Sequence, residues 1–116
     1  MIAFDGSATT RKCVEMVASS PLLRGLECHL IAVGGQAEAK EGLDWARGRL
    51  ADAGVAPQVH ALDGDAAEVI AARVDDLDVD LLVMGAYGHS RIRTMIVGST
   101  TTQLLRTCEI PMLLLR

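Results

Sequence analysis

Short apolar runs alternate with stretches of helical periodicity along the chain, and this alternation constrains the fold more than any other feature. It is typical of successive strand and helix units around a mainly parallel sheet. The runs are almost continuously apolar, which favours strands that are covered on both faces. We expect strands at residues 2–4, 28–33, 57–62, 81–84 and 112–115.

The stretches between these runs place apolar side chains on one face of a helix. The four stripes are Cys13, Val14, Met16 and Val17; Leu43, Ala46, Leu50 and Ala53; Val69, Ile70, Val74 and Leu77; and Thr101, Leu104, Leu105 and Cys108. Because crossovers between parallel strands are right-handed, few arrangements remain. We predict an α/β fold with a doubly wound, mainly parallel sheet of five strands in the order 3-2-1-4-5 and four helices.

The length and composition favour one globular domain over residues 1–116. A chain of 116 residues supports one core and is too short for two ordinary domains. Half of the residues are apolar and 22% are charged, which excludes a disordered segment. The apolar runs are too short to cross a bilayer, and no signal-peptide pattern precedes the first strand. We therefore expect a cytoplasmic protein without membrane association.

The charge and the cysteine and histidine patterns exclude several other classes of protein. A formal net charge of −4 argues against nucleic-acid binding, which selects for a basic surface. The odd number of cysteines and the lack of a CxxC pair favour reduced, partly buried thiols. These cysteines are Cys13, Cys28 and Cys108. His29, His60 and His89 lack the spacing of zinc ligands, and we interpret His29 and His60 as structural strand residues.

The segment after the fourth strand is rich in glycines, arginines and hydroxyls: residues 85–101 read GAYGHSRIRTMIVGSTT. In the predicted order, strands 1 and 4 are neighbours and the chain leaves them in opposite directions. Ligands bind in the crevice that such a switch point opens at the carboxyl ends of the strands. Because Asp5 follows the first strand and Gly85 follows the fourth, both are expected at this crevice.

The glycines and the start of the last helix predict an anion site. Gly85, Gly88 and Gly98 allow the backbone to approach a ligand closely. Gly98 and Ser99 open a helix, whose first N–H groups lack internal partners and whose dipole favours anions.

Hydroxyl and guanidinium groups near this helix start support a phosphate cradle. Ser99, Thr100 and Thr101 can donate to phosphate oxygens, and Arg91 and Arg93 can add positive charge. The alternative interpretation is that Ser99 is only an N-cap, that the glycines are turn residues and that the arginines are solvated.

Other phosphate-binding and catalytic motifs do not fit. The chain has neither GxxxxGK[ST] nor a GxGxxG after any strand. Residues 88–92 resemble a nucleophile elbow around Ser90, but Ile92 replaces the closing glycine and the helix begins too late. We therefore expect no nucleophilic serine.

The spacing G-x2-G-x9-G-[ST], from Gly85 to Ser99, resembles the ATP-binding motif of the universal stress protein family. The resemblance extends over nearly the whole chain. Residues 1–7 are similar to the opening strand and acidic turn of the family, residues 30–33 to its second strand, and residues 110–115 to its closing strand with a proline.

The resemblance implies a bound adenine nucleotide, ATP or else AMP or ADP, together with Mg²⁺. It places Asp5 and the backbone of Ala3 and Val33 at the adenine and ribose. It assigns close approach and phosphate contacts to Gly85, Gly88, His89, Gly98, Ser99 and Thr101. The hydroxyl of Thr100, at the start of the same helix, is a further candidate for a phosphate contact.

The leading hypothesis is an ATP-binding stress-response or regulatory domain with no catalytic residue. The cradle offers no lysine or water-orienting glutamine, so fast phosphoryl transfer is not expected. The first alternative is a slow ATPase or adenylate-forming enzyme in the same crevice. The second is a nucleotide-independent dimerisation or interaction domain.

The last strand predicts a homodimer. Pro111 favours a sheet edge, and the exposed apolar edge of Met112–Leu115 invites pairing with a second copy, as the family resemblance also implies. The chain is shorter than most relatives of that family and starts inside what should be a central strand. This start suggests either a trimmed chain or one domain of a tandem protein.

Overall fold

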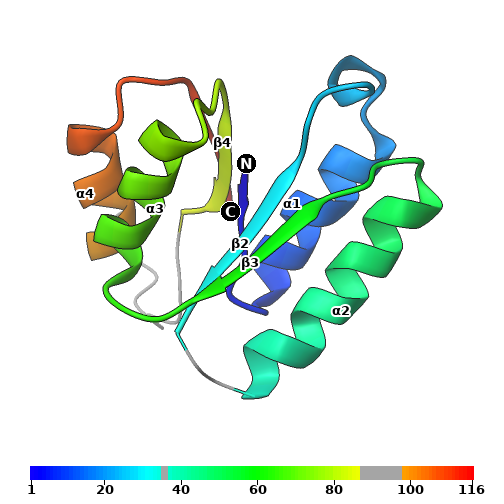
Figure 1. The fold of residues 1–116 in the computed structure, drawn as a ribbon, viewed down its shortest axis with the longest axis horizontal. Coiled ribbons are helices and arrows are strands. Elements are labelled where there is room, and N and C mark those ends of the chain that lie inside the picture. The colour runs from blue at the N-terminus through cyan, green and yellow to red at the C-terminus, as the bar shows by residue number, and fades with distance from the viewer. Residues whose placement is uncertain (35–36, 87–97) are drawn as a thin grey trace.

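The computed structural model describes residues 1–34, 37–86 and 98–116. Within these residues, five parallel strands form one sheet in the order β3-β2-β1-β4-β5, which confirms the predicted order (Figure 1). The strands are β1 Ile2–Ala3, β2 His29–Val33, β3 Gln58–Leu62, β4 Leu82–Gly85 and β5 Met112–Leu115. The helices are α1 Ala8–Ser19, α2 Ala37–Asp52, α3 Ala66–Asp76 and α4 Ser99–Thr107, and a short 3₁₀ helix, η1 Pro21–Leu23, follows α1.

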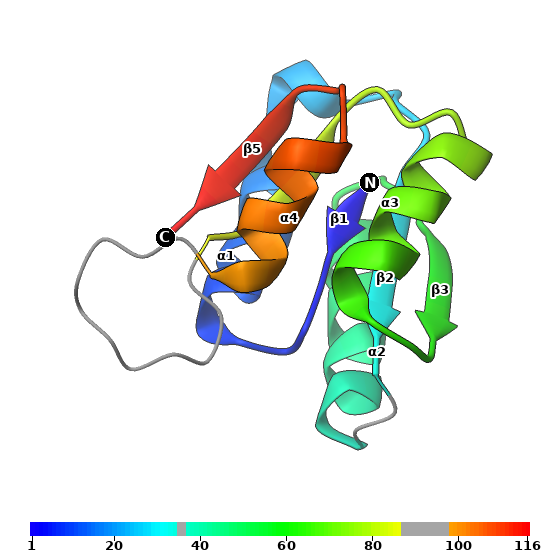
Figure 2. The ribbon, with the colours of Figure 1, turned by 90° about the vertical axis from the view of Figure 1, so that its left-hand side faces the viewer.

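Helices cover the sheet in two layers, α1 and α2 on one face and α3 and α4 on the other (Figures 1 and 2). Successive residues of β2 point to opposite faces. Leu30 packs in the core under α1 and α2 with Val14 and Leu50, whereas Ile31 packs in the second core with Leu104. The structure is therefore a doubly wound α/β fold, as the apolar periodicity predicts.

The carboxyl ends of β1 and β4 lie side by side at the switch point. Ile2 pairs with Val83, and the next residues of both strands continue in the same direction. The chain leaves β1 toward α1 on one face, and α4 lies on the opposite face of the sheet (Figure 1). The chain therefore departs to opposite faces of the sheet at this point, which is where the sequence predicts a ligand crevice.

The structure corrects the predicted elements in detail. Phe4, Cys28, Pro57 and Leu81 lie just outside the strands to which they were assigned, whereas the bounds of β5 are as predicted. Ala53 follows the end of α2 and does not belong to that helix.

Two predictions of burial are wrong. The edge strand β3 is not covered on both faces, because Val59 and Ala61, which point to the same face, remain exposed. Leu105 is 49% exposed although its neighbour Leu104 is fully buried. One residue is a rotation of about 100° around a helix, so α4 turns one of these side chains to the core and the other to solvent.

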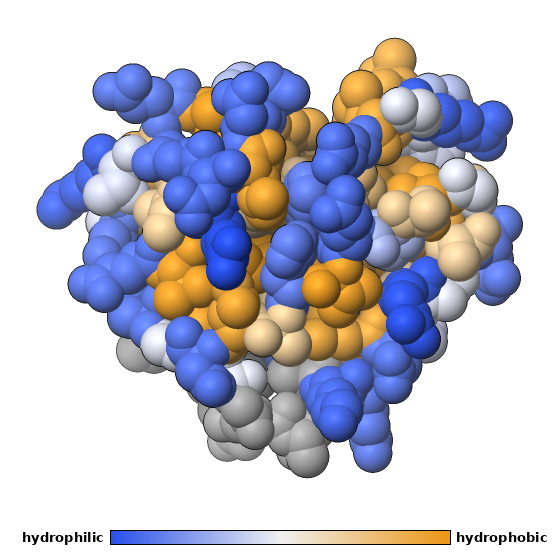
Figure 3. Space-filling model, in the orientation of Figure 1, coloured by the Kyte–Doolittle hydropathy of each residue, from blue (hydrophilic) through white to orange (hydrophobic). Residues whose placement is uncertain are grey.

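The surface carries apolar side chains in the loop after α1, at the top right of Figure 3, where Leu22 is 90% and Leu26 60% exposed. The three cysteines are free thiols, with Cys13 buried and Cys28 and Cys108 half-buried, as predicted. Burial raises the pKa of all three thiols, that of Cys13 to about 11. In the described part of the chain, no helix has both the length and the apolar character to span a membrane.

Candidate functional site

A cavity of about 170 Å³ lies at the carboxyl ends of β1, β2 and β4, beside the start of α4. Its lining includes eight of the residues that the sequence assigns to a ligand: Ala3, Asp5, Val33, Gly85, Gly98, Ser99, Thr100 and Thr101. The other two assigned residues, Gly88 and His89, lie outside the described residues. Four separate elements thus meet where the strand order predicts a crevice.

Six further residues line this cavity and were not found from the sequence: Phe4, Thr10, Ile31, Ala66, Ile70 and Met84. Ile31, Ile70 and Met84 are buried core residues that give the cavity an apolar wall. Their apolar character was visible in the sequence, but only the packing of α3 against β2 shows that they also face a cavity. The polar groups come from Asp5, from Thr10 and from the first turn of α4.

The first turn of α4 has no side-chain cap. Gly98 is the N-cap residue, its φ is −55°, and no side chain of the described residues bonds to the cap. Ser99 is the first helical residue, so the alternative interpretation of Ser99 as the N-cap is wrong. The N–H group of Thr102 donates to Gly98 O over 2.9 Å, which is the first bond of the helix ladder. The preceding N–H groups belong to the set that a helix leaves without an internal partner.

Gly85 and Gly98 are glycines for different reasons. A Cβ atom on Gly85 would lie 3.1 Å from Thr9 Cγ2, so the packing of α1 against β4 leaves little room for a side chain there. Among the described residues, the atom nearest to a Cβ atom on Gly98 would be Ala86 O at 3.8 Å, which is an ordinary contact. The described part of the fold therefore leaves space at Gly98 for a side chain or a ligand.

The buried Thr101 hydroxyl connects α4 to the end of β4. Its Oγ1 donates to Ala86 O over 3.4 Å, and Gly98 N donates to the same carbonyl over 3.3 Å. Thr101 is 3% exposed. Its hydroxyl proton therefore already has an acceptor within the fold.

The Asp5 carboxylate is held in place at the end of β1. Its Oδ1 atom accepts hydrogen bonds from Ser7 N and from Thr10 Oγ1, both over 2.9 Å. Gly6 has a φ of +83°, which lets the chain turn between the strand and the helix. Ser7 is the N-cap of α1 and accepts from Thr10 N. The spacing of Ser7 and Thr10 is that of an N-cap and its N3 residue, which is the sequence signal that could have identified Thr10.

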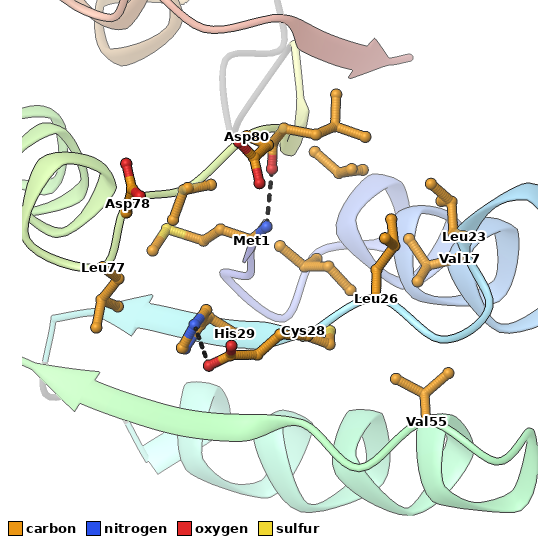
Figure 4. A pocket seen from close by; sticks show the side chains of 15 residues that line it. Met1, Val17, Leu23, Leu26, Cys28, His29, Val55, Leu77, Asp78 and Asp80 are labelled. Carbon is orange, nitrogen blue, oxygen red and sulfur yellow. Dashed lines mark hydrogen bonds and ion pairs between the residues drawn. The ribbon is translucent and has the colours of Figure 1, made fainter.

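A second cavity, of about 200 Å³, lies at the opposite, amino ends of the strands (Figure 4). Leu26, Cys28, Val79 and Asp80 are among its lining, and the Met1 amino group donates to Leu81 O over 2.8 Å. Of the assigned ligand residues that the structure describes, none lines this cavity.

His29 borders the second cavity and belongs to a polar cluster across two strands. Its Nδ1 lies 3.1 Å from His60 Nε2, and its Nε2 lies 3.2 Å from Glu27 Oε1. Burial and the nearby His29 and Arg73 charges lower the pKa of His60. Both histidines are strand residues, as predicted, and their side chains contact each other across β2 and β3. Among the described residues, no group of three or more His, Cys, Asp and Glu side chains could hold a metal ion.

Comparison with known proteins gives a match to the universal stress protein family over residues 1–116. Universal stress protein Slr1230 from Synechocystis is 42% identical over 119 residues, which cover 100% of this chain and 42% of that protein. The chain thus spans less than half the length of this relative.

Solved structures share the fold. A universal stress protein in complex with cAMP has a TM-score of 0.80 at 21% identity, over 99% of this chain and 93% of that one. The universal stress protein from Archaeoglobus fulgidus in complex with dAMP has a TM-score of 0.77 at 21% identity, over 99% of this chain and 94% of that one.

Proposed function

The chain belongs to the universal stress protein family, and from this premise we propose that it is a stress-response or regulatory domain that binds an adenine nucleotide, with ATP as its ligand. The observation that carries the proposal is the cavity that unites the Asp5 carboxylate with the start of α4. The complexes of two relatives with cAMP and dAMP support an adenine nucleotide as the class of ligand.

The two ends of the cavity suit the two ends of a nucleotide. The first N–H groups of α4, which have no partner within the helix, and the hydroxyls of Ser99 and Thr100 are donors for phosphate oxygens. The carboxylate of Asp5 is an acceptor for ribose hydroxyls. The apolar wall of Ile31, Ile70 and Met84 offers a surface against which a base can pack.

Mg²⁺ fits this donor set as a partner of the phosphates and not as a resident ion. Mg²⁺ is commonly bound by one or two carboxylates together with substrate phosphates and water. Asp5 is the one carboxylate in the described lining of the cavity. Bound Mg²⁺ would neutralise phosphate charge, while Asp5 would hold either the ion, through water, or the ribose.

The lining favours binding over turnover. Asp5 is the only ionisable side chain among the described residues that line the cavity. Fast phosphoryl transfer requires a positioned base or water-orienting group and strong neutralisation of charge at the γ-phosphate. We therefore infer that ATP is held and released rather than rapidly hydrolysed.

Substitution at Gly98 tests this proposal with a matched control. In Gly98→Glu, a carboxylate occupies the start of α4 and opposes the phosphates by its volume and its charge. In Gly98→Ala, the added Cβ has room among the described residues, because the nearest of their atoms is 3.8 Å away and the φ of −55° suits any residue. Calorimetric titration with Mg-ATP should show binding to the native chain and to Gly98→Ala, and a loss of at least about a hundredfold in Gly98→Glu.

Two other results of this titration would contradict the proposal. If Gly98→Glu binds Mg-ATP as tightly as Gly98→Ala does, the phosphates do not lie at the start of α4. If the native chain binds no adenine nucleotide at millimolar concentration, the proposed function is wrong.

We also propose that the chain forms a homodimer through β5. This strand lies at the edge of the sheet next to β4 (Figure 2), and its apolar residue Leu113 is 39% exposed. Its unpaired edge is a template for a second strand. The molar mass of the protein in solution tests this proposal.

A further inference from the structure

Thr10 is a buried polar residue in the lining of the cavity. It lies in the first turn of α1 and is 5% exposed. Its Oγ1 atom lies 2.9 Å from Asp5 Oδ1, 3.1 Å from Ser7 O and 3.3 Å from Ser7 Oγ. The hydroxyl thus lies within a group of acceptors at the point where the chain passes from β1 to α1.

The hydroxyl carries one proton, and the Asp5 carboxylate is the acceptor that best satisfies it. The distance to Asp5 Oδ1 is the shortest of the three, and a bond to an ionised acceptor is about twice as strong as a bond between neutral groups. Ser7 Oγ can then donate to Thr10 Oγ1 while it accepts from Thr10 N. The Thr10 hydroxyl, the Ser7 hydroxyl and the Asp5 Oδ1 atom therefore each have a hydrogen-bond partner of the complementary type.

Two donors on one carboxylate oxygen restrict the orientation of Asp5. Ser7 N and Thr10 Oγ1 both donate to Oδ1, one from the backbone and one from a side chain of α1. Asp5 itself is exposed, so each fixed donor reduces the freedom of its carboxylate to turn in solvent. Burial of Thr10 keeps water from replacing its hydroxyl.

The methyl group of Thr10 makes a separate contact. A Cβ atom on Gly85 would lie 3.5 Å from Thr10 Cγ2, so this methyl group packs beside the end of β4. Thr10 therefore touches both strand ends that border the cavity, β1 through its hydroxyl and β4 through its methyl group. Valine retains the methyl group without the hydroxyl, and serine retains the hydroxyl without the methyl group, so the two contacts can be tested separately.

We propose that Thr10 is a positioning residue of this site, whose hydroxyl holds the Asp5 carboxylate in the orientation that accepts the ribose of the nucleotide. This inference rests on the proposed function. Thr10 acts through Asp5 and makes the carboxylate ready before the ligand arrives, which lowers the cost of ordering it on binding.

The test is a calorimetric titration of Mg-ATP into the native chain, Thr10→Val, Thr10→Ser, Asp5→Asn and the double variant Thr10→Val with Asp5→Asn. We expect Thr10→Val to weaken binding by about tenfold and Thr10→Ser to restore most of the affinity. In the Asp5→Asn background, Thr10→Val should have little further effect, because the carboxylate that it positions is gone. Inorganic tripolyphosphate, which has no ribose, should bind the native chain and Thr10→Val equally.

Each contrary outcome is distinguishable. Native affinity in Thr10→Val overturns the positioning role and leaves the proposed function intact, whereas absence of binding by the native chain overturns both. An equal loss in the native and Asp5→Asn backgrounds, or an equal loss for tripolyphosphate, identifies a merely structural role and also overturns the inference. Thermal unfolding of every variant establishes that each protein is folded at the temperature of titration.

Discussion

Substitution of alanine for glycine should raise the stability of the chain at one glycine of α2 and lower it at the other. Gly48 is exposed, and a Cβ atom built on it meets nothing within 4 Å. A Cβ atom on Gly42 lies 2.8 Å from Cε1 and 3.2 Å from Cζ of Phe4, and 3.5 Å from the Gly6 backbone. Phe4 is 3% exposed and belongs to the core under α1 and α2, so its ring has little room to move away.

The expected magnitudes follow from helix propensity and from packing. Alanine in place of glycine within an exposed helix gains about 1 kcal/mol, which Gly48→Ala should show in full. Gly42→Ala has the same gain, but insertion of a methyl group into a filled core costs about 1–3 kcal/mol. We therefore expect Gly42→Ala to be less stable than Gly48→Ala by about 1–3 kcal/mol in the free energy of unfolding.

Urea unfolding followed by circular dichroism measures this difference, with unchanged m-values as the check on two-state behaviour. Phe4→Leu provides the second half of the test, because the shorter side chain removes the ring atoms that the new methyl group meets. In that background, Gly42→Ala should become neutral or stabilising. If Gly42→Ala stabilises the native chain as much as Gly48→Ala does, a methyl group at residue 42 does not clash with the Phe4 ring, and the reasoning is refuted.

Two further predictions concern pH and assembly. Because the pKa of His60 is lowered in the folded chain from its ordinary value of 6.5, the unfolded chain takes up this proton first, and the free energy of unfolding should fall as the pH drops through 6.5. His60→Gln should show a smaller fall in urea titrations between about pH 7 and 5, and an identical pH profile would refute the assignment. If β5 forms the dimer, Leu113→Glu should halve the molar mass found by light scattering, whereas Leu22→Glu, a change at a more exposed leucine, should not. A native chain that is already monomeric would contradict the proposed dimer.

The outline of the site could be predicted because it depends on few and local facts. Apolar runs and helical stripes locate the elements, and the right-handedness of crossovers limits how the strands can be ordered. Once β1 and β4 are neighbours, the residues that follow them must meet at one edge of the sheet. This is why Asp5, Gly85 and the start of α4 could be assigned to one crevice from their positions alone.

The reason for each glycine could not be read from the spacing. Gly85 and Gly98 belong to one motif, yet only the structure shows that a Cβ atom on Gly85 would press on Thr9, whereas one on Gly98 would make an ordinary contact with Ala86 among the described residues. The sequence likewise left Gly98 and Ser99 as alternative N-cap residues of α4, and the backbone geometry identifies Gly98 as the N-cap. These distinctions depend on distances between different helices and strands. A local sequence pattern carries no information on such distances.

The sequence by itself determined the sheet, its strand order and the place of the crevice, because hydrophobic periodicity and chain handedness act along the chain. Only the tertiary structure decided which side chains meet across it. The contact of Gly42 with Phe4 and the pairing of His29 with His60 depend on how a helix settles on a sheet and on the register of neighbouring strands. Thr10 depends on both, because the local turn from β1 to α1 brings its hydroxyl to Asp5, whereas the packing of α1 against β4 brings its methyl group to Gly85.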